Sequence, residues 1–533
     1  MDKLHFIHSR AGRIGGRADT TPIDVDAIVE GLQRDSRKHL VIHFHGGLVS
    51  KEEGLAIAQR LLNEARVYSP SPTTGGHAVF YVWESGAWET IRNNLTELAD
   101  EPVFKQLLRK LVQYTLERLG AKDVVGTRSI SQSSCGALAS EVSDAFDAFW
   151  NQPGRTTIPY RDFAPLADAA QARSASLAIS EDEIQADLEQ DVAFLASLAT
   201  LPDLPSATRS AFAPQGAVER RSAFSELASR EFSKHSATRG LVELFQVAKF
   251  IVRVLRGVLR RYSGGRDHGL YATCVEELIR GFKIAGSGLN EWGKALEWNR
   301  MKQDTADAFG PDPDAHAGTA LLARLGVAIA KGLSLDRLTL IGHSTGAIYI
   351  AHWLEASKRY LPEALKQDVV LLAPAITHDF FATTLQSCGM RIGGFRMFAM
   401  RDALERDDQV WGQDDELRDR RDWRRYLYPS SLLYLVSGLL ESRRNAEGEW
   451  EDEPDMPILG MERFLANTQI YGDASFPSVK VVREWLGADA RRVVWSQTTS
   501  SPIGLNSECI DHGSFDNDST TLDSLREIVV RGF

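Results

Sequence analysis

The sequence predicts a doubly wound α/β fold, in which helices cover both faces of a mostly parallel sheet. Short runs of apolar, β-branched and aromatic residues, bounded by Gly, Pro, Asp or Ser, recur along the chain. Such continuous apolar runs are typical of strands buried on both faces. Helical patterns separate or follow them, and this alternation predicts a layered α/β architecture. The expected strands are residues 39–44, 78–83, 338–341, 369–373, 395–400 and 492–495.

Length and composition set limits on the class of protein. The chain has 533 residues, enough for one large domain with insertions or for two to three domains. Its hydrophobic content of 43% and charged content of 25% describe an ordinary soluble globular protein. The formal net charge of -11 argues against a nucleic-acid-binding protein, because such proteins neutralise phosphates with a positive surface.

Cysteine usage and the absence of targeting patterns predict a cytoplasmic location. Cys135, Cys274, Cys388 and Cys509 lie far apart and form no C-x-x-C pair, so we expect reduced thiols and no disulfide framework. The first residues contain no apolar core of a signal peptide. No window of about 18 residues is apolar enough to predict a membrane-spanning helix.

The predicted strands are unevenly spaced, which indicates insertions. About 250 residues separate the strand at 78–83 from that at 338–341, whereas a simple crossover needs a few tens. We expect this region to be a helical cap, with helices at 103–119, 138–150, 181–198, 241–262 and 274–298, and core helices at 56–65 and 519–530. The predicted division is a first core segment (1–100), the cap or lid (101–330), a second core segment (331–402), a second insertion (403–489) and a final core segment (490–533).

A G-x-S-x-G motif directly follows the predicted strand at 338–341. Gly342 and Gly346 flank Ser344, and residues 347–354 have a helical pattern. A sharp turn from strand to helix exposes the serine oxygen, and small flanking residues make that turn sterically possible. The motif therefore predicts Ser344 as a nucleophile.

A second glycine motif, HFHGGL at residues 43–48, follows the first predicted strand. Preorganised backbone N–H groups stabilise the oxyanion of a tetrahedral intermediate, and glycines let the main chain approach it. We expect one donor to be the N–H of Thr345 and the other to come from Gly46, Gly47 or Leu48. A plain glycine turn after a strand is the alternative interpretation.

Two histidines of this motif also allow a metal interpretation. His43 and His45 form H-x-H, but no further ligand cluster accompanies them in the sequence. A zinc site normally needs three or four ligands, so we expect no metal, and we expect His45 to brace the glycine loop.

His512 is the expected general base. It lies in a loop beyond the predicted strand at 492–495, from which it could fold back onto Ser344, accept its proton and return it to the leaving group. His378, after the strand at 369–373, is the second candidate, although its position suits a pocket wall better. With a histidine base, activity is expected to fall as the pH drops through a pKa near about 6.5.

The triad acid is expected just after the strand at 395–400. Asp402 follows that strand directly and is the first choice, while Asp407 and Asp408 remain open as alternatives. The same charged run could instead be a solvated loop.

Taken together, these motifs resemble the α/β-hydrolase superfamily, in particular its lipase-like and esterase-like serine hydrolases. The order serine, aspartate, histidine, the nucleophile elbow and the HGG-type loop carry the resemblance, which covers about residues 1–85, 335–402 and 490–533. It implies a serine esterase or lipase that cleaves a carboxylic ester through an acyl-enzyme, with no cofactor. Lids in this family often follow the strand after the elbow, but residues 375–394 are too short for one.

Two alternatives stay open beside the esterase. Peptidase or thioesterase chemistry uses the same triad, and the fold alone does not choose between them. From a different class, the chain could be a non-catalytic, hydrolase-like interaction protein whose helical insertion is a docking module.

The segment 241–262 raises the question of a membrane partner. It is amphipathic, and its basic residues are Lys249, Arg253, Arg256, Arg260 and Arg261. Such a helix can lie on an anionic bilayer, which would suit a lipase or phospholipase effector acting on lipid esters. The alternative, which we favour, is a cap helix that packs its apolar face on the rest of the protein.

Downstream of that segment, Glu276, Glu277 and Arg280 are expected to combine helix packing with surface ion pairs.

Overall fold

The computed structural model describes most of the chain, in separate ranges. These are residues 2–83, 101–123, 180–199, 241–285, 298–408, 428–498 and 501–533, with Leu98 and Ala228 as isolated positions. Within the ranges, positions 48, 72, 429, 442, 445–449, 452–454, 473 and 475 are not described. The predicted helix at 138–150 lies outside the described residues.

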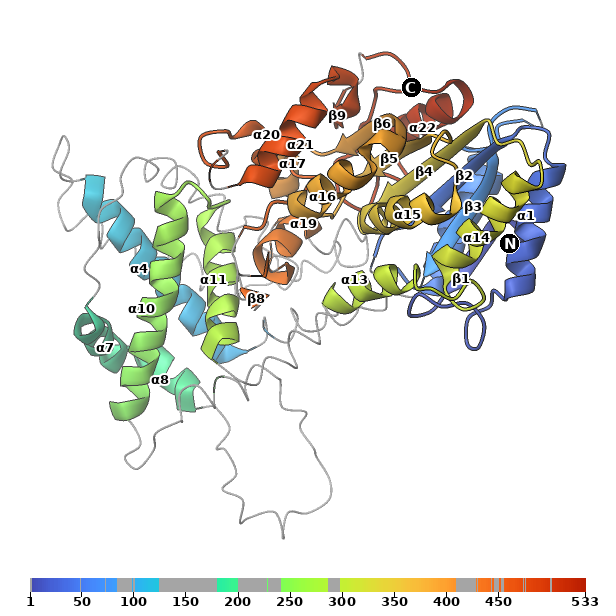
Figure 1. The fold of residues 1–533 in the computed structure, drawn as a ribbon. Coiled ribbons are helices and arrows are strands. Elements are labelled where there is room, and N and C mark those ends of the chain that lie inside the picture. The colour runs from blue at the N-terminus through green and yellow to red at the C-terminus, as the bar shows by residue number, and fades with distance from the viewer. Residues whose placement is uncertain are drawn as a thin grey trace, which may run out of the picture.

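Seven parallel strands form one sheet, in the order β1-β3-β2-β4-β5-β6-β9 (Figure 1). The predicted α/β architecture is confirmed, and each predicted strand is present. The strands are β1 (Phe6–Ser9), β2 (His39–Phe44), β3 (His77–Trp83), β4 (Arg337–His343), β5 (Gln367–Leu372), β6 (Ile392–Ala399) and β9 (Val493–Trp495). Strand β1 was not predicted, because half of this four-residue segment is polar.

Helices cover both faces of the sheet, and each face has its own hydrophobic core. On one face a row of helices packs side by side: α1 (Pro22–Arg34), α14 (Ala317–Ala330), α15 (Gly346–Tyr360), α16 (His378–Cys388) and α21 (Pro477–Gly487). The other face carries α2 (Lys51–Gln59), the π-helical turn η2 (Arg60–Glu64) and α22 (Ser519–Arg531). Alternate residues of β2 divide between the two cores: Leu40 and Ile42 join the first, and Val41 joins the second. This period of two is what a strand buried on both faces requires.

The predicted cap, in the part that the structure describes, is mainly helical. It contains α4 (Pro102–Asp123), α7 (Glu181–Gln190), α8 (Val192–Ala199), α10 (Leu241–Ser263) and α11 (Leu270–Ala285). Asp191 interrupts the helix predicted over 181–198, because its side chain accepts a hydrogen bond from the N–H of Phe194 at 2.9 Å and starts a new helix. Of the helix predicted over 274–298, the structure describes α11 and the first residue of α13 (Trp298–Asp307).

Helix α10 buries its apolar face within the protein. It packs against α4, α7 and α11, and Phe250, Ile251, Val254 and Leu255 are all buried. This is the packing expected of a cap helix. Among the described residues, no helix combines the length and apolarity needed to cross a bilayer.

Short elements complete the chain. They are the helices α17 (Asp402–Asp407), α19 (Leu432–Leu435) and α20 (Glu462–Ala466), the π-helical turn η6 (Val436–Leu440), the 3-10 turns η1 (Lys3–His5), η4 (Gly389–Arg391) and η7 (Ala490–Arg492), and an antiparallel pair, β7 (Arg443–Arg444) with β8 (Trp450–Glu451).

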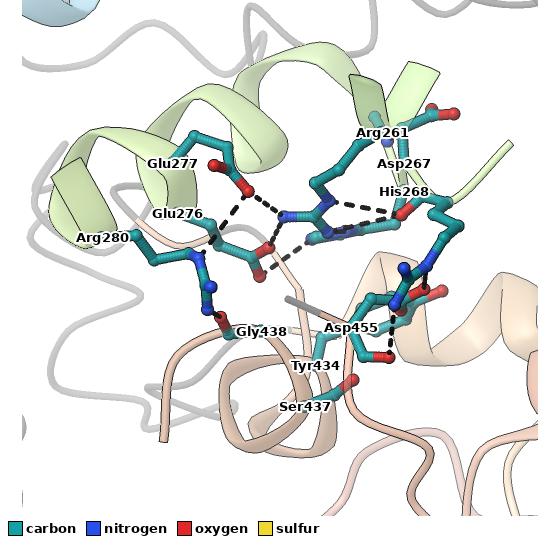
Figure 2. Close-up of polar contacts among 12 residues, drawn as sticks. Arg261, Asp267, His268, Glu276, Glu277, Arg280, Tyr434, Ser437, Gly438 and Asp455 are labelled. Carbon is teal, nitrogen blue, oxygen red and sulfur yellow. Dashed lines mark hydrogen bonds and ion pairs between the residues drawn. The ribbon is translucent and has the colours of Figure 1, made fainter. Parts of the chain in front are cut away.

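A network of buried charges joins the cap to the segment 428–471 (Figure 2). We call it the cap charge cluster; its members are Arg261, Arg266, His268, Glu276, Glu277, Arg280, Asp455 and Arg463. Arg261 donates to Glu276 at 2.5 Å, and Arg280 donates to the carbonyl of Gly438 at 3.2 Å. The expectation of surface pairs at Glu276, Glu277 and Arg280 is therefore wrong, because α11 packs against the turn η6 and encloses all three side chains.

Candidate active site

The sheet order places a topological switch point between β2 and β4. The chain leaves β2 toward α2 on one face, and it leaves β4 toward α15 on the other. Loops that diverge in this way at the carboxyl ends of adjacent strands open a crevice, where α/β proteins commonly bind ligands. The loop after β2 contains Gly46 and Gly47, and the turn after β4 contains Ser344.

Ser344 occupies the tight turn between β4 and α15 in a left-handed conformation, with φ of 52°. A non-glycine residue in this region is strained, and such strain is typical of a nucleophile elbow. Neighbouring contacts hold it: the Ser344 N–H donates to the carbonyl of Leu372 at 2.8 Å, and its carbonyl accepts from the N–H of Ala375 at 3.1 Å. Main-chain bonds to the end of β5 thus fix the turn.

The flanking glycines are required by close approach. A Cβ at Gly346 would lie 2.4 Å from the carbonyl oxygen of Phe44, and one at Gly342 would lie 2.7 Å from the carbonyl carbon of Gly346. Both distances are far below a normal contact, so the turn can sit against β2 only with glycine at these positions. The G-x-S-x-G spacing is therefore explained by the local geometry.

The structure brings His512 to Ser344. The Nε2 atom of His512 lies 3.0 Å from the Oγ atom of Ser344, across a separation of 168 residues. His512 lies in the loop between β9 and α22, and both of its main-chain polar groups are held. Its N–H donates to Oδ2 of Asp408 at 2.9 Å, and its carbonyl lies 2.9 Å from Nε2 of His343. The ring is therefore positioned to accept the serine proton.

The structure does not bring Asp402 to His512. The Oδ1 atom of Asp402 accepts a hydrogen bond from the hydroxyl of Tyr434 at 2.7 Å, and its N–H donates to Glu462 at 2.8 Å. Nδ1 of His512 has no hydrogen-bond partner among the residues that the structure describes. Asp402 begins α17, so its carboxylate faces α19, on the side toward the cap charge cluster.

Asp408, one of the alternative acids, is the carboxylate that contacts the histidine loop. It lies one residue beyond the end of α17, is buried, and accepts the N–H of His512 through Oδ2. This contact is to the main chain of His512, and Nδ1 of the ring makes no such carboxylate contact among the described residues. The geometry therefore favours Asp408 over Asp402 as the partner of the histidine loop, while Asp407 is the last residue of α17.

The glycine loop after β2 lies directly against the elbow. A Cβ at Gly46 would lie 3.4 Å from Cβ of Ser344, and a Cβ at Gly47 would lie 2.4 Å from Oγ1 of Thr345. The N–H of Gly47 donates to that hydroxyl at 2.9 Å, so this group holds the loop to the elbow. Leu48 lies outside the described residues.

Thr345 is the residue whose main chain best suits an oxyanion. It is the N-cap of α15, at the positive end of the helix dipole, and it directly follows Ser344. Gly46, beside the Cβ of Ser344, is the second member of the predicted set that the structure places at the nucleophile.

His45 fixes the glycine loop from behind. The Trp83 N–H donates to Nε2 of His45 at 3.1 Å, so the proton lies on Nδ1, which donates to the carbonyl of Gly46 at 2.6 Å. His43 points to the other face, where Nδ1 lies 2.7 Å from the hydroxyl of Tyr68. Burial lowers the pKa of His43 to about 3 and that of His45 to about 4, so both rings are neutral. Among the described residues, no group of three His, Cys, Asp or Glu side chains could hold a metal ion.

The protonation of His512 is set first by burial and then by His343. Burial, and to a smaller extent the electrostatic interaction with His343, together lower the pKa of His512 to about 3. The ring is consequently a neutral acceptor at pH 7. The acid limb expected from sequence near 6.5 moves to lower pH, because desolvation disfavours the imidazolium.

His378, the second candidate base, lies elsewhere. It begins α16, its N–H donates to the carbonyl of Pro457 at 2.9 Å, and its ring contacts that of Phe464. His343 is the residue that sequence reasoning missed. Its only signal is its position directly before Ser344, since its partner is the distant main chain of His512.

Comparisons with protein-family models, with curated proteins and with solved structures gave no match for this chain.

Proposed function

We propose that this chain is a serine hydrolase with an α/β-hydrolase fold that cleaves a carboxylic ester through an acyl-enzyme. The observation that carries the proposal is the 3.0 Å approach of His512 Nε2 to Ser344 Oγ, with Ser344 in the left-handed turn between β4 and α15. A serine in a strained strand-to-helix turn, paired with a neutral imidazole, is the arrangement that nucleophilic acyl transfer needs.

The proposed reaction has two halves. Ser344 Oγ attacks the ester carbonyl carbon while Nε2 of His512 takes the hydroxyl proton, and the N–H of Thr345 stabilises the oxyanion. Collapse of the tetrahedral intermediate breaks the bond to the alcohol, which leaves with the proton held by His512. A water molecule then attacks the acyl carbon, gives its proton to His512, and releases the acid as Ser344 recovers its proton.

Asp408 is the acid in this scheme. While Oδ2 holds the main-chain N–H of His512, the second carboxylate oxygen is the one proposed to meet Nδ1, where it would stabilise the imidazolium that forms in each half-reaction and keep the proton of the neutral ring on Nδ1. Asp402 instead supports α17 through Tyr434.

A fluorophosphonate probe tests the proposal directly, because it reacts only with an activated serine. Wild-type protein is expected to label, and Ser344→Ala is expected to lose all labelling. Ser334→Ala, at an exposed serine, is the matched control and should label like the wild type. Absence of labelling in the folded wild type would contradict the proposal and favour a non-catalytic interaction protein.

A series of acyl esters of increasing chain length then identifies the substrate class. The apolar face of α10 packs against other cap helices, so we expect dispersed esters to be cleaved without a lipid surface. Arg256 and Arg260 are exposed on α10, whereas Arg261 is buried in the cap charge cluster. Loss of liposome co-sedimentation on charge reversal at Arg256 and Arg260 would instead support the membrane-surface lipase.

A further inference from the structure

His343 is the last residue of β4, and its side chain reaches the main chain of the general base. The residue is buried, and its Nε2 atom lies 2.9 Å from the carbonyl oxygen of His512. A carbonyl can only accept a hydrogen bond, so Nε2 of His343 must carry a proton. The contact fixes the tautomer of His343 without involving either ring nitrogen of His512.

This bond closes a clamp on the main chain of His512. The N–H of His512 is held by Asp408, beyond α17, and its carbonyl is held by His343, at the end of β4. The surrounding loop between β9 and α22 contains no helix or strand among its described residues. These two bonds therefore hold the main chain of His512 where a helix or strand would use its own backbone hydrogen bonds. With both groups held, the ring places Nε2 against Ser344.

The two imidazoles also interact as charges. Their ring centroids lie 5.6 Å apart, and both residues are buried, so a proton on one ring disfavours a proton on the other. Other titratable groups that face this pair or belong to the described part of its loop are Asp408, His43, His45, Arg60, Glu508, Cys509, Asp511, Asp516 and Asp518.

We propose that His343 is a positioning residue for the acyl-transfer reaction: it fixes His512 through the main-chain carbonyl, and its ring, 5.6 Å from that of His512, disfavours a proton on the base. The proposal rests on the proposed function for its catalytic consequence. The clamp itself is a property of the fold and can be measured without turnover.

Two substitutions separate the two roles. His343→Gln keeps an N–H donor near the position of Nε2 but removes the ionisable ring, whereas His343→Leu removes both. Loss of a bond that leaves a buried carbonyl unsatisfied is expected to lower kcat/KM by about 10- to 100-fold in His343→Leu, and His343→Gln should recover most of that loss. His352→Leu, at a half-buried histidine of α15 that contacts Phe309 and Phe380, is the control for removal of a packed imidazole ring.

The pH profile distinguishes positioning from a merely structural effect. Because the interaction with His343 lowers the pKa of His512, replacement of the His343 ring raises that pKa, and both variants should show an acid limb at higher pH than the wild type. His352→Leu should leave the limb in place. Equal kcat/KM values in His343→Leu and His343→Gln, or unchanged limbs in both, would overturn the proposal.

Titration of the histidine rings by 13C NMR provides the readout that needs no substrate. The His512 signal is assigned by its loss in His512→Gln, and it should titrate at higher pH in both His343 variants. If the wild type fails to label with fluorophosphonate but the His512 signal still shifts as expected, the hydrolase proposal fails while the coupling of the two rings stands. If labelling succeeds and the His512 signal does not move, the inference about His343 fails alone.

Discussion

The Ser344–His512 site and the cap charge cluster are both buried and polar, yet they consist of different kinds of polar group. At the site the polar groups are imidazole rings, a hydroxyl and main-chain groups, and the carboxylate of Asp408 holds the main chain of the base. The cluster consists mainly of arginine and carboxylate side chains, with Arg261 donating to Glu276 at 2.5 Å. Burial lowers the pKa of His512 at the site and that of His268 in the cluster, whereas the arginines of the cluster lie against carboxylates of opposite sign.

This difference predicts whether a substitution in each region lowers activity or stability. Main-chain bonds survive most side-chain replacements, so the site should lose activity without losing the fold. A buried ion that loses its partner keeps the whole cost of its desolvation, so the cluster should lose stability first. The cluster is also tightly packed. A Cβ at Gly438 would lie 2.3 Å from Oε1 of Glu276, so neighbouring side chains have little space in which to rearrange after a substitution.

The largest effect is expected from removal of the base. His512→Gln should lower kcat by about 10⁴- to 10⁶-fold, because the imidazole that contacts the hydroxyl of Ser344 is lost as its proton acceptor. Steady-state ester hydrolysis measures the loss, and circular dichroism should show an unchanged melting transition. A loss of less than about 100-fold would mean that another group acts as the base.

Next in size is the choice between the two acids. Asp408→Asn should lower kcat by about 10²- to 10⁴-fold, since an amide cannot stabilise the imidazolium. Asp402→Asn keeps an oxygen acceptor for Tyr434 and should cost less than about 10-fold. Parallel measurement of kcat for the two variants decides the assignment, and a larger loss in Asp402→Asn would restore Asp402 as the acid.

Substitutions in the cap charge cluster should lower the stability of the fold. Arg261→Met leaves Glu276 buried without its guanidinium partner and should lower the free energy of unfolding by about 3–5 kcal/mol. Arg260→Met, at the exposed neighbouring position, is the matched control and should cost less than about 0.5 kcal/mol. Urea denaturation of both variants measures the difference. Equal midpoints for the two would show that the cluster does not support the fold.

The last prediction is a gradual loss of stability in acid, shared among several buried histidines. Burial holds the pKa of His43, His378 and His512 at about 3 and that of His45 at about 4. Between these values and about pH 6.5 the unfolded chain binds protons that the folded chain does not, so stability is complete above pH 6.5 and declines as the pH falls. Each group contributes up to about 1.4 kcal/mol per pH unit in this window. A melting temperature that is constant from pH 7.5 to pH 5 would contradict it.

Local pattern was enough to predict the sheet and the elbow. Strands such as β2 and the turn at Ser344 are specified by residues adjacent in sequence, namely an apolar run and two glycines that the structure explains by close approach. His512 was found because a loop after the last strand returns to the same edge of the sheet.

Neither the triad acid nor the cap charge cluster could be predicted from local sequence patterns. Which aspartate faces His512 depends on the direction of α17, and Tyr434 and Glu462 set that direction from 32 and 60 residues away. Glu276 looks like an exposed helix position until Tyr428 and the turn at Gly438 cover it, more than 150 residues downstream. Partners at such separations leave no periodic signal in the sequence.

The separation of Ser344 from His512 also has a consequence during synthesis. The two residues are 168 positions apart, and β9 and the histidine loop are the last parts of the sheet to be translated. At about 5–20 residues per second, a growing chain carries the serine for roughly 10–30 s before its base exists. Under the proposed mechanism a nascent chain therefore has no hydrolytic activity, which begins only when the final strand joins the sheet.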